Sequence, residues 1–218
     1  MIGQALMLIF VFFAVNIFFS GGIVSSFFEE TQKFTFRNFW YECSRFFWRF
    51  LRLTFYFLIF HAVLFGIFGF IYYSLIEGGS NANLVSEVTI VSTAKIILPI
   101  YGIFAIVLSM IQDYAKIHLV AGDKKILTKP ILETFKLVFR NFGKTFPLYL
   151  LNILTLVLIF GIYRLFQNCI SDDNSIGILL MFLVSQFFIF GRIGVKLLNL
   201  SSATYLYKDF DNQSVAEV

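Results

Sequence analysis

Five apolar stretches, each long enough to cross a lipid bilayer, constrain this chain more than any other feature of its sequence. They lie at about 2–19, 51–76, 90–119, 145–166 and 176–200. A helix needs about 20 mainly apolar residues to cross the hydrocarbon core. Backbone polar groups find no water inside a bilayer, so spanning segments of this length must be helical. The sequence therefore predicts an all-α membrane protein with five transmembrane helices in a single transmembrane domain, 1–218.

The composition agrees with this prediction and argues against a water-soluble protein. Of the 218 residues, 59% are hydrophobic and only 14% are charged, whereas a soluble domain averages about 25% charged residues. Nucleic acid is a poor explanation for the net charge of +4, because the basic residues alternate with apolar residues and form no solvated basic patch.

Two amphipathic stretches, 36–50 and 128–144, precede the second and fourth spans. In each, aromatic and aliphatic residues recur at helical spacing on one side, and charged residues occupy the other sides. Such a helix lies in the membrane interface with its apolar side in lipid. We therefore expect two interfacial elbow helices, each joined with almost no break to a span. The helix–elbow–helix unit repeats at 2–76 and 88–166.

Three boundaries follow from local sequence. Ser20-Gly21-Gly22 is expected to break or bend the first helix. The third helix is expected to leave the bilayer still helical, up to about residue 119. The fifth span extends through 201–208, followed by a polar tail at 209–218.

The distribution of positive charge predicts the topology. Fifteen of the 17 Lys and Arg residues fall at 20–52, 111–144 and the C-terminal end, whereas only Lys95 and Arg164 fall on the opposite side. Cytoplasmic segments carry the excess of Lys and Arg, so both elbows and the C-terminus are expected on the cytoplasmic side of a bacterial inner membrane. Five spans then put residue 1 outside. We expect that a natural precursor carries an upstream spanning segment; a genuine outside N-terminus is the alternative.

Basic and aromatic residues of the two elbows are the candidates for contact with lipid headgroups. They are Arg37, Trp40, Arg45, Trp48, Arg49, Arg52, Lys136, Arg140 and Lys144. Cations beside a bilayer attract anionic lipid with about 1 kcal/mol each, and burial of the aromatic side adds to this. The expected partners are therefore anionic headgroups at the cytoplasmic face, together with a protein partner in the membrane.

Four stretches, at Phe39–Leu53 (FWYECSRFFWRFLRL), Asp113–Lys125 (DYAKIHLVAGDKK), Pro147–Asn152 (PLYLLN) and Arg192–Tyr205 (RIGVKLLNLSSATY), carry a family resemblance. In their content and order the chain resembles a loose group of uncharacterised bacterial polytopic membrane proteins. The resemblance covers most of 20–207. It implies a further N-terminal region, and it implies no activity. Gly122-Asp123 stands where an acidic pair is more usual in that group.

Polar residues within or near the spans form two candidate groups. Asp113 and Lys116, spaced i, i+3, predict an ion pair where the third helix leaves the bilayer; it either orients the helix or forms a gate or proton-coupled site. His61, Asn152 and Gln186 lie within spans. They either line a polar path between helices or form hydrogen bonds that hold helices together.

Motifs for catalysis and cofactor binding are missing from the sequence. It contains no HExxH, P-loop, serine-nucleophile motif, CxxC or Cys/His cluster, so we expect no catalytic, cofactor or metal site. We expect a non-enzymatic scaffold, accessory subunit or lipid-interacting component. The alternative is a small transporter or channel that uses the polar path. A lipid-modifying enzyme acting through Asp113 and His118 is a third hypothesis.

Overall fold

The computed structural model describes residues 2–28, 34–79, 87–122, 128–170 and 175–216, and almost all of them are helical. The helices are α1 (Ile2–Phe28), α2 (Phe36–Gly79), α3 (Glu87–Ala121), α4 (Thr128–Arg140), α5 (Phe142–Cys169) and α6 (Ser175–Ala216). All except α4 are long and apolar enough to cross a membrane. The predictions of an all-α, multi-pass membrane protein and of five candidate spans are confirmed.

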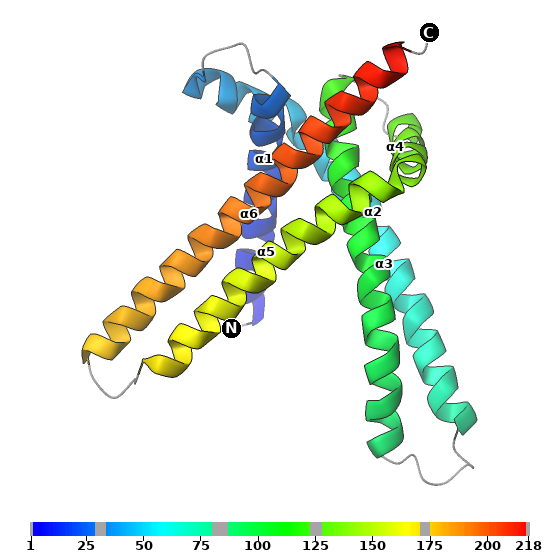
Figure 1. The fold of residues 1–218 in the computed structure, drawn as a ribbon, viewed down its shortest axis with the longest axis vertical. Helices are drawn as coiled ribbons and strands as arrows, with labels where there is room; N and C mark the ends of the chain where they lie inside the picture. Colours follow the sequence, from blue (N-terminus) through cyan, green and yellow to red (C-terminus); the bar gives the residue numbers. More distant parts are fainter. Residues whose placement is uncertain (1, 29–33, 80–86, 123–127, 171–174, 217–218) are drawn as a thin grey trace.

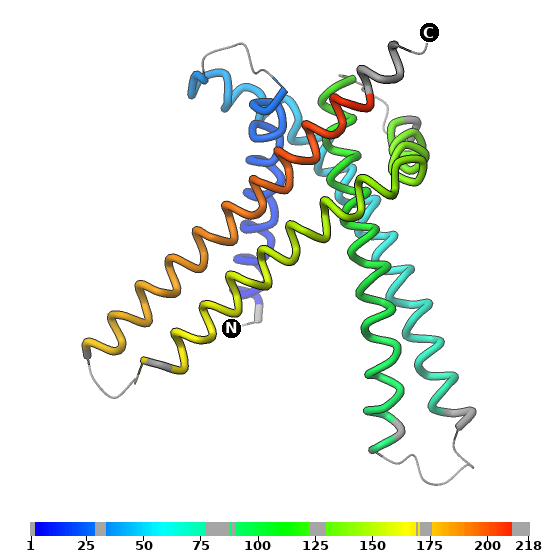
Figure 2. Tube along the Cα trace, in the orientation of Figure 1, coloured from blue at the N-terminus to red at the C-terminus, as the bar shows by residue number. Residues whose placement is uncertain are grey.

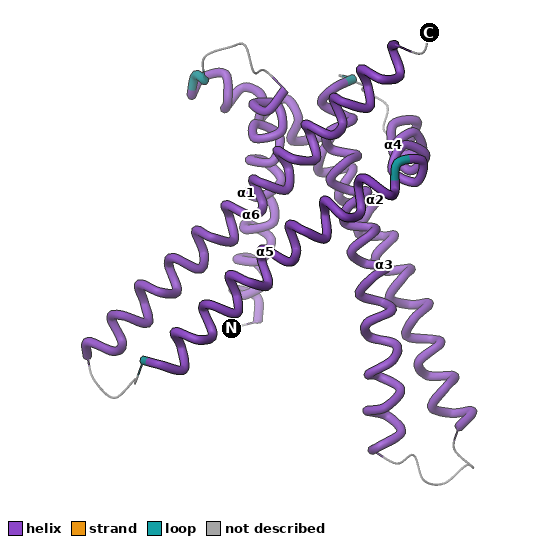
Figure 3. Tube along the Cα trace, viewed as in Figure 1, coloured by secondary structure: helices purple, strands orange, loops and turns teal. Residues whose placement is uncertain are grey.

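Two helical hairpins, α2–α3 and α5–α6, make up most of the molecule (Figure 1). They lie close together where α3 ends and α5 begins, which we call the closed end. They diverge toward the open end, where α2 and α5 end and α3 and α6 begin (Figure 2). The start of α2, the short α4 and the end of α6 all lie at the closed end (Figure 3). The two expected elbows and the C-terminal helix thus share one end; which side of a membrane it faces stays a prediction.

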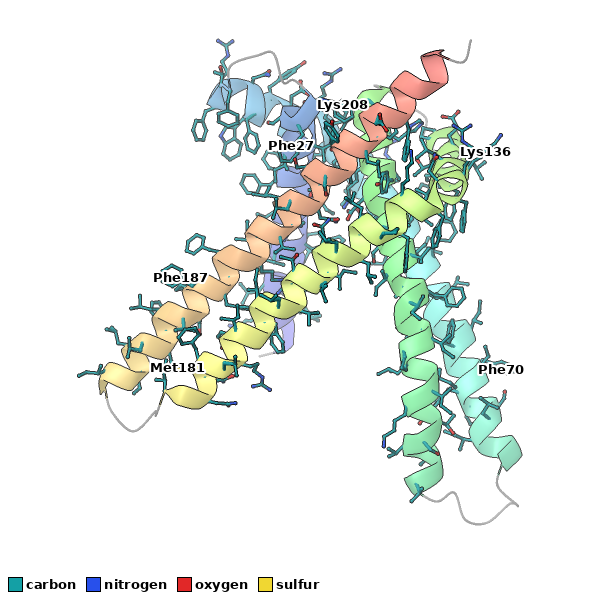
Figure 4. All side chains as sticks on the ribbon, in the orientation of Figure 1. Phe27, Phe70, Lys136, Met181, Phe187 and Lys208 are labelled. Atoms are coloured by element: carbon teal, nitrogen blue, oxygen red, sulfur yellow. The ribbon has the colours of Figure 1, made fainter. Side chains whose placement is uncertain are left out.

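The buried core lies at the closed end. It includes Phe50 and Phe57 of α2, Tyr114 and Ile117 of α3, and Leu200 of α6, all at most 2% exposed. Large side chains on the other halves of the hairpins are exposed instead, among them Phe70 at 71% and Phe187 at 76%, both labelled in Figure 4. Lipid is as apolar as these side chains, so no hydrophobic force draws the open ends together in a bilayer.

Of the two predicted effects of Ser20-Gly21-Gly22, a break is wrong, because α1 continues to Phe28. These glycines allow α1 and α2 to approach closely. A β-carbon on Gly22 would lie 2.5 Å from Cys43 Sγ and 2.7 Å from the Phe39 ring, and one on Gly21 would lie 3.1 Å from Phe46 Cβ. The glycine pair therefore serves helix packing, a role that small residues often have in membranes.

The first expected elbow, 36–50, is the beginning of the continuous helix α2 and not a separate helix. Its side chains Cys43, Phe46 and Phe50 are at most 2% exposed, so much of its apolar side packs against protein and not lipid. The second expected elbow is a separate helix, α4, which ends at Arg140, four residues before the predicted boundary. An interfacial position for either segment stays a prediction.

Lys208 of α6 joins the closed end of the bundle to α1. Its ammonium group donates to the backbone oxygens of Phe27 at 3.0 Å and Phe28 at 3.5 Å, and both Phe27 and Lys208 are labelled in Figure 4. Terminal carbonyls of a helix lack partners within the helix, and a cation there is favourable. The helix α6 continues to Ala216 and so includes most of the polar tail predicted at 209–218.

Candidate functional site

An ion pair on α3 begins the most polar cluster that the structure describes. Asp113 and Lys116 are one turn apart, and Lys116 Nζ donates to Asp113 Oδ1 at 2.9 Å. Their side chains are only 20% and 14% exposed. Because an unpaired charge removed from water is costly, each of these residues depends on the other.

Side chains from α5 and α6 extend this pair into a network. Asn199 Nδ2 donates to Asp113 Oδ2 at 3.2 Å. Asn152 Nδ2 donates to Asn199 Oδ1 at 3.1 Å and to Ser202 Oγ at 3.2 Å. Tyr149 of α5 lies close enough to Asp113 and Asn199 for their side chains to act on its hydroxyl. We call these six residues, Asp113, Lys116, Tyr149, Asn152, Asn199 and Ser202, the polar junction.

The polar junction joins α3 to the α5–α6 hairpin at the closed end. Each bond between its residues pairs a donor with an acceptor, and the Asp113 carboxylate receives bonds on both oxygens. This arrangement holds three helices together through groups that would be costly to leave unpaired in an apolar surrounding.

Two further cations, Arg192 and Lys196, lie beside the junction on α6. Lys196 Nζ donates to Asn16 Oδ1 of α1 at 2.6 Å. Lys196 is close enough to Lys116, Asp113 and Arg192 for their charges to act on it. Within the described ranges no carboxylate pairs with Arg192 or Lys196. We call these two residues the basic pair.

A second cluster links α4 to α3 and α6. The His118 ring contacts Tyr207 Oη through Nδ1 at 2.6 Å and Glu133 Oε2 through Nε2 at 2.9 Å. Tyr207 is 6% exposed and the Glu133 side chain is 49% exposed. This cluster therefore holds α4 against α3 and α6 at the closed end, and its Glu133 side is partly exposed to solvent.

The three residues of the predicted polar path lie in different environments. Asn152 belongs to the polar junction, whereas the His61 ring contacts the Phe57 backbone oxygen of its own helix at 2.8 Å. Gln186 lies on the half of α6 nearer the open end. No contact recorded among the described residues joins His61 or Gln186 to Asn152.

The predicted headgroup residues lie on α2, α4 and the start of α5. Trp40 and Trp48 are 51% and 63% exposed, and the side chains of Arg37, Arg52, Lys136, Arg140 and Lys144 are also exposed. Arg45 pairs with Glu42 at 3.3 Å, and Arg45 and Arg49 both lie over the Phe46 ring. Lys144 lies over the ring of Phe210. Many of these cations can thus reach water or headgroups.

Sequence reasoning missed Tyr149, Asn199 and Ser202 as members of the site. A signal for two of them exists in α6, where Arg192, Lys196, Asn199 and Ser202 recur every three or four residues and so share one side of the helix. Tyr149 carries no comparable signal, because a Tyr near the start of a span is also a common interface residue.

The described residues contain no group of three or more His, Cys, Asp or Glu side chains gathered as metal ligands are. An apolar groove between α5 and α6 is lined by residues such as Ile159, Tyr163 and Phe188. The candidate site therefore consists of the polar junction, which holds helices together, and the basic pair, which can attract an anion.

Comparisons with protein-family models, curated proteins and solved structures give no match.

Proposed function

We propose that this protein is a non-enzymatic scaffold or accessory subunit of a bacterial inner membrane that binds a partner membrane protein along its hairpins. One observation carries the proposal: the hairpins pack together only at the closed end, and the halves beyond it expose apolar side chains on several sides. The matched bonds of the polar junction suit a structural link better than a reactive centre.

Exposed glycines on α2 offer a place for a partner helix. Gly66 and Gly69 lie one turn apart on the open half of α2, and β-carbons added to them would meet no atom of the chain within 4 Å. Helices in membranes associate through small residues, because these let two backbones approach closely. This surface therefore accommodates a helix of the partner.

Anionic lipid at the closed end is the second part of the proposal. The exposed cations of α2 and α4, with Trp40 and Trp48, favour headgroup contact at the cytoplasmic face. The resemblance to uncharacterised bacterial membrane proteins supports a bacterial membrane and adds no activity.

Isolation of the tagged chain in native nanodiscs tests the proposal. We expect one membrane protein to co-isolate in a fixed ratio, and the double variant Gly66→Leu/Gly69→Leu to lower that ratio at least fivefold. Gly161→Leu, another exposed glycine with open space around it, serves as the control and keeps the ratio. Isolation of the wild type as a lone chain, with lipid of bulk composition, contradicts the proposal.

The alternative, a small transporter or channel, is favoured by the polar character of Asn152 and its neighbours alone. Solute flux into liposomes tests it. Flux that is unchanged when His61, Asn152 and Gln186 are all replaced by Leu rules out the polar path.

A further inference from the structure

The basic pair is a local excess of positive charge that no carboxylate of the described residues neutralises. Among those residues, Asp113 is the carboxylate that acts on Lys196, and it is already paired with Lys116 at 2.9 Å. Lys196 donates to the amide oxygen of Asn16, and this amide carries no net charge. Three cations therefore share one carboxylate where α1, α3 and α6 meet, and an anion at this place would relieve their repulsion.

The basic pair lies at the depth of lipid phosphates if α6 crosses the bilayer. The apolar part of α6 begins at Ile176, and 20 residues of helix separate it from Lys196. At about 1.5 Å per residue this distance is roughly 30 Å, which matches the hydrocarbon thickness of a typical bilayer. The ammonium group of Lys196 then reaches the headgroup layer without leaving its helix.

Apolar surface continues from the basic pair toward the open end. On α1, Phe12 and Ile9 lie on the side of Asn16, one and two turns away, and they are 71% and 64% exposed. On α6, Ile193 and Ile189 lie on the side of Lys196, 51% and 48% exposed. Cations at one depth with exposed apolar residues beneath them match a molecule that has an anionic head and an acyl chain.

We propose that Lys196 and Arg192, with Lys116 adding charge and Asn16 orienting Lys196, bind the phosphate of one anionic phospholipid between α1 and α6. The ligand chemistry is a phosphate ester, and its acyl chains lie along Ile9, Phe12, Ile189 and Ile193. This inference rests on the proposed membrane placement, but it requires no protein partner. It also differs from the general attraction of the cations on α2 and α4, because it concerns one lipid at one site.

Native mass spectrometry of the whole purified chain tests the site. Phosphatidylglycerol is titrated into the wild type, into Arg192→Gln/Lys196→Gln and into the control Lys95→Gln/Arg164→Gln. The control removes two exposed cations at the open end, so both variants change the net charge equally. Melting curves verify that both variants fold, and phosphatidylcholine tests whether net anionic charge is needed.

We expect one phosphatidylglycerol to stay bound to the wild type and to the control. Loss of the basic pair should weaken binding about 30-fold, because each cation near the headgroups contributes about fivefold and the two factors multiply. Equal binding by all three proteins, or an equal loss in both variants, overturns the site. Displacement of the lipid by millimolar inorganic phosphate supports the anion site but identifies soluble phosphate as its ligand. A wild type that retains this lipid but co-isolates with no membrane protein from native nanodiscs supports the site while contradicting the scaffold role.

Discussion

Asn199 of α6 donates a hydrogen bond to Asp113 of α3 at 3.2 Å, across 86 residues of sequence. This bond connects the α2–α3 hairpin to the α5–α6 hairpin through the carboxylate that also neutralises Lys116. One side chain thus combines a local ion pair with a long-range contact between hairpins, which makes Asp113 the first residue to test.

Asp113→Asn is expected to lower the free energy of unfolding by about 1–3 kcal/mol, because Lys116 is left charged and mostly buried. Unfolding in SDS, followed by circular dichroism, measures the change. The double variant Asp113→Asn/Lys116→Gln removes both charges and should recover at least half of the loss. Lys116→Gln alone completes the cycle: if its effect and that of Asp113→Asn simply add in the double variant, the pair is not coupled and the interpretation is wrong.

Single replacements of polar residues in the spans distinguish a residue that links helices from one that bonds only within its own helix. Asn152→Leu breaks the bonds to Asn199 and Ser202 and should lower the unfolding free energy by about 0.6–2 kcal/mol. His61→Leu loses only a bond to its own helix and should change it by less than about 0.5 kcal/mol. The same SDS titration gives both values, and equal effects would argue against the polar junction as a helix link.

Gly22→Ala should destabilise the contact between α1 and α2 by about 1–3 kcal/mol, because the new methyl group overlaps Cys43 and Phe39. Gly66→Ala is the matched control, since its methyl group meets open space. Thermal melting in detergent compares them. A Gly22 variant as stable as wild type would mean that the helices separate easily at this contact.

Removal of the hydroxyl should affect the stability of the protein differently at two tyrosines. Tyr114 is 1% exposed, and its hydroxyl has no hydrogen-bond partner among the described residues. Tyr114→Phe should therefore leave stability unchanged or raise it by up to about 1 kcal/mol. Tyr149→Phe removes a hydroxyl that lies close to Asp113 and Asn199 and should lower stability by about 0.6–2 kcal/mol. Melting curves that rank the variants the other way would refute this prediction.

His118→Phe should loosen α4 while leaving the hairpins intact, because it removes the contacts to Tyr207 and Glu133. Hydrogen exchange should show protection in α4 falling about tenfold, equivalent to about 1.4 kcal/mol. Lys136→Gln, on an exposed position of the same helix, is the control. Equal exchange in the two variants would show that α4 is held by apolar contacts alone.

The sequence was sufficient to predict the spans, because the length and polarity of a segment alone decide whether it can cross a bilayer. It was not sufficient to identify what covers an apolar helix side. Cys43, Phe46 and Phe50 have the periodicity of a lipid-facing stripe, yet they pack against protein. Lipid and protein interior are both apolar, so periodicity does not distinguish them. The Ser20-Gly21-Gly22 stretch misled for a related reason, since glycine serves close packing as well as bending.

The candidate site was predictable only where its residues are close in sequence. Asp113 and Lys116 follow from a spacing of three on one helix. The partners Asn199 and Asn16 come from helices whose proximity depends on the whole fold. A polar residue in a span demands a partner, but the sequence does not say which one.

The bond between Lys208 and the last carbonyls of α1 has a consequence for biosynthesis. Residue 208 is made 181 residues after Phe27, which at about 5–20 residues per second takes roughly 10–35 s. During that interval the end of α1 has only water or headgroups as partners, although Gly21 and Gly22 can already pack against α2. Translation speed therefore sets how long α1 stays at the translocon with its end uncapped. Quality-control proteases can act on α1 during this interval.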